Sequence, residues 1–269
     1  MIQSIGTPSI LILITLATIF IYAFAAIAHQ YGINVPVTAV TFGISGLFLL
    51  IAGIAIIKKA RERIERRTVF FHFAYSFIAI AIFLLSITLP HFLLFTNPGL
   101  FSITLKWVLL EALIFLYLSL AFYLQAATEL YYPKGGKAAF WAIMIFGAVL
   151  FIGQIYSPAN PSFDIRSGIT LLDFGPFLGR FLPIIVIIGR APAALLFLIQ
   201  AFRSASAPTV RKRAFLLAIG TIIVIIGGPL HPLATTAAQF LAADALSFIG
   251  TVLMAAGILV HTPKPEESV

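Results

Sequence analysis

The chain has 269 residues, of which 61% are hydrophobic and only 10% charged, and it contains no cysteine. Soluble domains are about half apolar and about one quarter charged, so this composition excludes a soluble globular domain, a disordered chain and a coiled coil. The mean hydropathy of +1.09 indicates a polytopic α-helical membrane protein instead. The formal net charge of +8 indicates basic loops beside a lipid bilayer, and no nucleic-acid partner is expected.

Eight continuous apolar runs divide the chain. The hydrocarbon core of a bilayer takes about 20 helical residues, and each run reaches or approaches this length. They cover about residues 9–29, 36–57, 68–95, 103–128, 138–156, 181–202, 213–230 and 240–260. The first run is interpreted as a retained helix, because no Lys or Arg precedes it as in a cleaved leader. The expected fold is one all-α membrane domain, residues 1–269, with eight transmembrane helices and no strands.

Basic residues gather in alternate connections between these runs. Residues 58–67 contain six of them, residues 131–137 two and residues 203–213 four, and Lys264 follows in the tail. With eight spans all four segments fall on one side, which then holds 13 of the 17 basic residues. The positive-inside rule assigns that side, and with it both termini, to the cytoplasm.

The longest connection on the opposite side runs over residues 157–180. Its prolines and glycines exclude one continuous helix. Residues 169–174 within it are apolar enough to lie in the membrane interface as a short lid.

Ionisable side chains inside the spans are the first candidates for function, because each costs at least about 2.5–3.5 kcal/mol at the centre of a membrane helix. Glu111, Arg190 and Asp244 are such residues. Arg190 stands between Gly189 and Pro192, which predicts an interrupted helix beside a buried guanidinium and therefore an ion or solute pocket. The alternative is that Arg190 simply pairs with Glu111 or Asp244, or with backbone carbonyls freed by Pro192.

The histidines allow three interpretations. His91 and His231 are expected near the outer face, where they could bind zinc or copper together with Glu111 or Asp244. As a second possibility, His91/His231 and His72/His261 form two axial pairs for b-type haem. The third interpretation is that they are isolated interfacial residues without a ligand role, and on this interpretation no cofactor is bound.

No enzyme signature accompanies these residues. The sequence has no GxGxxG or GxxxxGK[ST] loop for phosphates, and no GxSxG elbow for a nucleophilic serine. Spans five to eight contain no lysine, which excludes a retinal Schiff base there. We therefore expect a non-enzymatic protein.

From about residue 36 to 260 the pattern resembles the seven-helix membrane sensor region of prokaryotic histidine kinases. The likeness lies in the basic segment 58–67 before an aromatic-rich span, in the segment 203–213 before the seventh run, and in the long outer loop. The resemblance implies a sensor-like unit or accessory subunit in a prokaryotic plasma membrane. Since no kinase domain follows, the signal would pass to a membrane or cytoplasmic protein partner. Two alternatives stay open: a haem-binding redox subunit, and a small-solute or ion transporter built around Arg190, Glu111 and Asp244.

Overall fold

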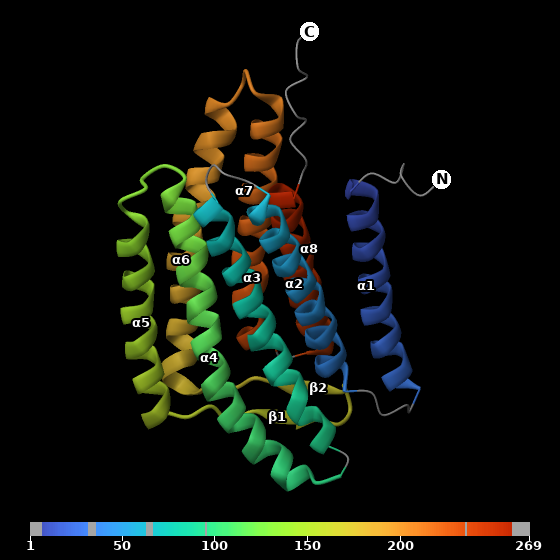
Figure 1. Ribbon diagram of the computed structural model, residues 1–269. Helices are drawn as coiled ribbons and strands as arrows, with labels where there is room; N and C mark the ends of the chain where they lie inside the picture. Colours follow the sequence, from blue (N-terminus) through green and yellow to red (C-terminus); the bar gives the residue numbers. More distant parts are fainter. Residues whose placement is uncertain (1–6, 32–35, 63–66, 95, 235, 260–269) are drawn as a thin grey trace.

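The structure, a computed structural model, describes residues 7–31, 36–62, 67–94, 96–234 and 236–259. Figure 1 shows an upright bundle of α-helices with a short strand pair across its lower end. The helices are α1 (Thr7–Gln30), α2 (Val37–Arg61), α3 (Arg67–Thr88), α4 (Pro98–Glu129), α5 (Gly136–Tyr156), α6 (Gly175–Arg203), α7 (Pro208–Leu230) and α8 (Ala237–Leu259). Two 3₁₀ turns, η1 (Leu89–Leu93) and η2 (His231–Leu233), follow α3 and α7. The strands are β1 (Ser162–Asp164) and β2 (Ile169–Leu171).

Seven of these helices, α2 to α8, are long and apolar enough to cross a membrane. The all-α architecture expected from composition is therefore confirmed, and these seven helices are compatible with a multi-pass membrane protein. The predicted first span overlaps α1, in which residues 14–28 form a shorter apolar helix. The total of eight spans stays a prediction.

Glycines allow two pairs of helices, α2 with α3 and α7 with α8, to pack closely. In α2, a Cβ atom on Gly46 would lie 2.8 Å from Leu85 of α3. The contact between α7 and α8 is closer still, because a Cβ on Gly220 would lie 2.6 Å from the carbonyl oxygen of Gly250. Seven residues further along α7, a Cβ on Gly227 would meet the Ser247 hydroxyl at 2.6 Å. Small residues at helical spacing permit this backbone contact, which fixes the position of α8 beside α7.

The basic connections meet at one end of the bundle, the upper end in Figure 1. Lys59 of α2 donates from Nζ to the carbonyl of Ile258 at 2.7 Å. Arg213 of α7 donates from Nε to the carbonyl of Gly257 at 3.0 Å. Cations favour the carboxyl end of a helix, so both stabilise the last turn of α8. Assigning this end to the cytoplasm remains a prediction.

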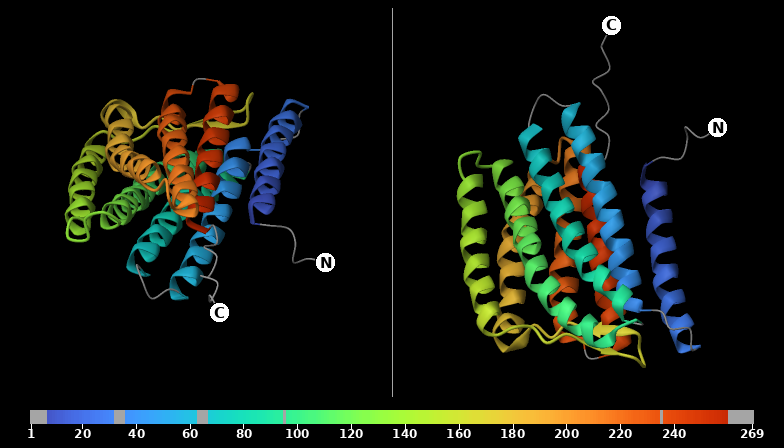
Figure 2. Two further views of the ribbon diagram at one scale, coloured as in Figure 1. Left: turned by 90° about the horizontal axis from the view of Figure 1, so that it is seen from above. Right: turned by 60° about the horizontal axis from the view of Figure 1, so that its bottom comes forward.

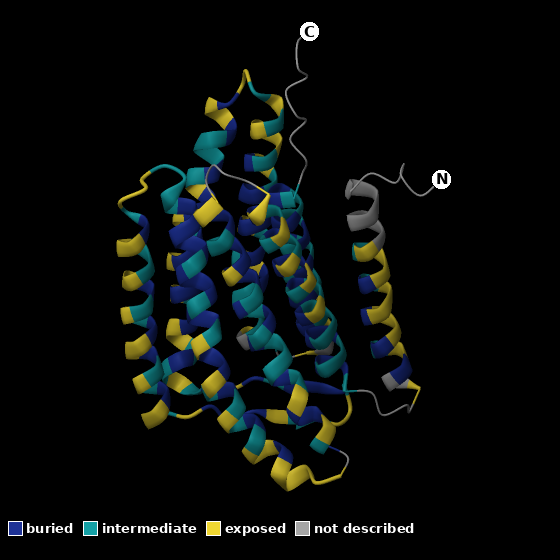
Figure 3. Ribbon diagram, in the orientation of Figure 1, coloured by how far each residue is buried: buried dark blue, intermediate teal, exposed yellow. Residues whose placement is uncertain are grey.

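Helices α1 and α5 stand at opposite sides of the bundle (Figure 2). Their outward surfaces are exposed, whereas buried residues concentrate on the helices between them (Figure 3). Helix α1 contacts the bundle through Tyr22, whose hydroxyl donates to the carbonyl of Thr41 in α2 at 3.0 Å. The core that positions the site is therefore formed by α2, α3, α4, α6, α7 and α8.

The 157–180 connection folds into a hairpin that the sequence analysis did not predict. Strand β1 pairs antiparallel with β2, with Ser162 opposite Leu171. The turn between them places Gly168 at φ 68°, a conformation that favours glycine. The Asp164 carboxylate accepts hydrogen bonds from the Ser167 hydroxyl and the Arg166 backbone, which hold the pKa of this carboxyl below its usual value.

Candidate functional site

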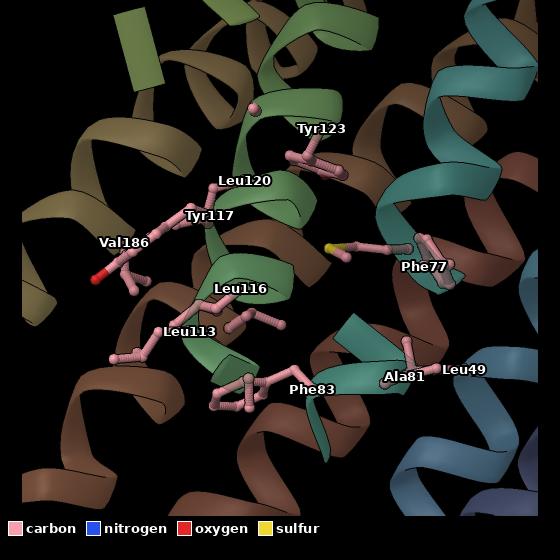
Figure 4. Packing of buried hydrophobic residues seen from close by; sticks show 14 of the residues in the cluster. Leu49, Phe77, Ala81, Phe83, Leu113, Leu116, Tyr117, Leu120, Tyr123 and Val186 are labelled. Carbon is pink, nitrogen blue, oxygen red and sulfur yellow. The ribbon is translucent and has the colours of Figure 1, made fainter. Parts of the chain in front are cut away.

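A cavity of about 150 Å³ lies within the bundle, lined by residues of α2, α3, α4, α6, α7 and α8 and by Leu172 and Phe174 of the 157–180 connection. Its walls are mainly apolar. Figure 4 labels six of the apolar side chains that line it, namely Leu49, Phe77, Phe83, Leu116, Leu120 and Val186. A concave, mainly apolar cavity with few polar groups is typical of small-molecule sites in proteins.

The cavity is elongated along the bundle axis. Helix α8 contributes lining residues from Asp244 through Ser247 and Thr251 to Met254. These positions recur every three or four residues, so they form one face of the helix. Ten residues separate the first from the last, which corresponds to about 15 Å at the rise of an α-helix. The cavity therefore has two distinct ends.

Arg190 lines the end of the cavity beside Met254, nearer the basic end of the bundle, and is only 5% exposed. Its guanidinium lies over the ring of Tyr123, 5.1 Å from the centroid. It donates one weak hydrogen bond, from Nη1 to the sulfur of Met254 at 3.8 Å. Among the described residues no carboxylate forms an ion pair with Arg190. A guanidinium carries five N–H donors, so most of its hydrogen-bonding capacity remains available to the cavity.

Helix α6 carries Arg190 without interruption. Helical structure runs from Gly175 to Arg203 with Pro183 and Pro192 inside it, so the predicted break near Arg190 is wrong. Gly189 instead allows a close approach to α4, since a Cβ there would lie 3.1 Å from Leu120. The helix is also six residues longer at its start than predicted, because proline is well tolerated in the first turn, as at Pro176.

His231 and Asp244 form the other polar end of the cavity. Nε2 of His231 pairs with Oδ1 of Asp244, and Nδ1 donates to the carbonyls of Gly227 and Gly228 at 3.2 Å. Burial alone lowers the pKa of His231, but the charge and hydrogen bond of Asp244 outweigh burial and raise it. Both ring nitrogens face acceptors, which matches an imidazolium paired with a carboxylate. The second oxygen of Asp244, Oδ2, is buried without a hydrogen-bond partner, as is Oγ of Ser247.

The hairpin closes the cavity at the His231 end. Leu172 and Phe174, directly after β2, are buried and line the cavity. The Thr170 backbone N–H donates to Oγ1 of Thr38 at 2.8 Å, which anchors β2 to α2. Of residues 169–174, Leu172 and Phe174 line the cavity, and the lid in the membrane interface stays a prediction.

Glu111 does not join this site. It is exposed on α4, and it does not line the cavity. Glu129 at the other end of α4 is 18 residues away, or about 27 Å along the helix. Since Glu129 lies at the basic end, Glu111 lies toward the opposite end of the bundle. The structure thus brings together Arg190 and Asp244 but not the third member of the predicted pocket.

The predicted histidine pairs have separate surroundings. Nδ1 of His91 donates to the carbonyl of Ile87 at 3.0 Å, and Nε2 lies 2.7 Å from Oγ1 of Thr170. His72 lies at the basic end, where Nδ1 is 2.9 Å from Glu129. His261 lies outside the described residues. Within the described part of the chain, no three His, Asp or Glu residues converge as a metal site would require.

Comparisons with protein-family models, with curated proteins and with solved structures return no match to this chain. The site is therefore characterised by its geometry. Of its polar residues, sequence reasoning identified Arg190, His231 and Asp244. It missed Tyr123 and Ser247, because a tyrosine and a serine in an apolar span are too common to signal a site.

Proposed function

We propose that this protein is a non-enzymatic, sensor-like membrane protein that binds a small, mainly apolar molecule in its central cavity. The single observation that supports the proposal is the central cavity itself, which has mainly apolar walls and a polar group at each end. Transport around Arg190, Glu111 and Asp244 is less well supported, because Glu111 lies outside the cavity. Haem binding is less well supported, because His72, His91 and His231 already have hydrogen-bond partners within the protein.

Helix α8 supports the sensor-like part of the proposal. One face of this helix lines the cavity from Asp244 to Met254, and its last carbonyls bind Lys59 and Arg213 at the basic end. A ligand shifts a conformational equilibrium only when it binds two arrangements unequally. A ligand that favours one position of α8 would therefore change the arrangement of the basic end, where we propose that a partner protein docks.

The binding part of the proposal is tested with decanol as a neutral apolar probe. Purified protein in lipid nanodiscs is titrated with decanol, and binding is followed by calorimetry. Val186→Phe adds volume to the cavity wall and should weaken binding strongly. The matched control is Ile187→Phe on the adjacent position, which is exposed outside the cavity and should leave binding unchanged. Equal binding by both variants would refute the cavity as the site.

The sensing part is tested by fluorescence, since a chain without cysteine accepts a single labelled cysteine. A dye on Arg211→Cys, exposed in the first turn of α7, reports on the basic end, and a dye on Lys134→Cys in the α4–α5 turn is the reference. Ligand should change the first signal and not the second. Proteoliposomes that accumulate the probe through the protein would favour transport and contradict the sensor-like function.

A further inference from the structure

The two ends of the central cavity differ in charge, and this difference bears on what the cavity binds. His231 and Asp244 form an internally compensated ion pair at one end. Arg190 at the other end has an aromatic ring and a sulfur beside it but no described carboxylate. The net charge of these three side chains is therefore one positive charge, which lies on Arg190.

A buried cation without a counter-charge is costly in a membrane protein, and such residues face a cavity or a partner. The ring of Tyr123 offsets part of the cost through a cation–π interaction. The ring below the guanidinium cannot accept hydrogen bonds from its N–H groups, because these point outward in the plane of the guanidinium. A carboxylate in that plane can accept them. Because Arg190 lines the cavity and is 95% buried, the acceptor that suits those N–H groups would enter from the cavity.

We infer that the ligand is an elongated monocarboxylate: its carboxylate binds Arg190 and its apolar chain fills the cavity toward Asp244. This inference rests on the proposed function and names the class of its ligand. The stripe on α8 between Asp244 and Met254 is about 15 Å long, which suits a medium-length alkyl chain. The apolar walls exclude a second charge along the middle of the ligand.

The far end of the ligand carries a hydrogen-bond donor. Oδ2 of Asp244 and Oγ of Ser247 are buried there without partners, and both residues line the cavity. Buried acceptors that stay unpaired cost free energy, so a ligand hydroxyl that donates to Asp244 adds to affinity. An ω-hydroxy carboxylate therefore fits both ends of the cavity better than a simple fatty acid.

Three probes of equal chain length test the inference: decanol, decanoate and ω-hydroxydecanoate. Affinities are measured by calorimetry in nanodiscs of zwitterionic lipid. A hydrogen-bonded charge pair contributes about ten- to a hundredfold in affinity, so decanoate should bind the natural protein more tightly than decanol by this factor. ω-Hydroxydecanoate should bind more tightly still, and equal affinities for it and decanoate would refute the donor at the far end.

Arg190→Gln should remove the preference for decanoate and leave decanol binding unchanged. Arg190→Lys keeps the charge and should retain a reduced preference, which separates the loss of a charge from misfolding. Arg180→Gln on the exposed face of the same helix is the matched control and should behave as the natural protein. If decanol binds but decanoate is not preferred, or if Arg190→Gln keeps the preference, the ligand class is wrong and the proposed function survives. If none of the three probes binds, the proposed function fails as well.

Discussion

The contact between α7 and α8 predicts a large penalty for a single added methyl group. In Gly220→Ala the new Cβ would lie 2.6 Å from the Gly250 oxygen and 2.8 Å from the Met254 nitrogen, which are both backbone atoms. The helices must separate by several tenths of an ångström, and a gap of 0.5–1 Å forfeits roughly a quarter to a half of the local dispersion energy. Overpacking of this kind costs about 1–3 kcal/mol, partly offset by the higher helix propensity of alanine.

We therefore expect Gly220→Ala to lower the free energy of unfolding by about 2 kcal/mol. Gly179→Ala in α6 is the control, because a Cβ there meets nothing within 4 Å and alanine should stabilise the helix slightly. Reversible unfolding in mixed detergent micelles, followed by circular dichroism, measures both variants. The double variant Gly220→Ala/Gly250→Ala should cost less than the sum of the two single changes, because the first methyl already separates the helices. A Gly220→Ala protein as stable as the natural one would refute this account of the interface.

Three further predictions concern the surroundings of the cavity. Thr170→Val should cost about 1–3 kcal/mol in the same unfolding assay, because it leaves Nε2 of the buried His91 without a partner, and an unchanged stability would contradict a contribution of this hydrogen bond. Tyr22→Phe should cost about 1 kcal/mol by removing the hydrogen bond to α2, and proteolysis should then release α1 more readily than in the natural protein. The third prediction concerns pH. The pKa of His231 in the folded protein is raised above its ordinary value of 6.5. The stabilisation from its pair with Asp244 is therefore complete below pH 6.5 and is lost as the pH rises through the raised pKa. Thermal unfolding across this range should show the loss in the natural protein and not in Asp244→Asn.

The helices were predictable because lipid imposes one strong rule, continuous apolar runs of membrane-spanning length. Each predicted run overlaps one helix of the bundle, with ends that differ by a few residues. The grouping of the basic segments 58–67 and 203–213 at one end also agrees with the structure, through the hydrogen bonds of Lys59 and Arg213 to α8. The hairpin was not predictable, because its strands have three residues each and its pairing depends on a turn at Gly168.

The site was predictable only in part, because hydropathy gives the depth of a residue along a helix but not the direction it faces. Arg190 and Asp244 face inward and line one cavity, whereas Glu111 faces outward from α4. A shift of one or two residues along a helix decides between these outcomes, because residues three or four apart share a face. An apolar helix that is surrounded by lipid and protein shows little periodicity to reveal which face points inward. The pairing of His231 with Asp244 depends on the turn of the chain between α7 and α8, which a single sequence does not specify.

The prolines of α6 have a consequence for how the cavity responds when it is filled. Pro183 and Pro192 leave the carbonyls of Gly179 and Ile188 without helical N–H donors, and helices bend where such bonds are missing. Helix α7 has one internal proline, Pro229 near its end, and contacts α8 closely at Gly220 and Gly227, so these two helices should move as a single rigid body. A ligand that fills the cavity should then displace α7 and α8 together relative to α6, and α6 should flex on either side of Arg190.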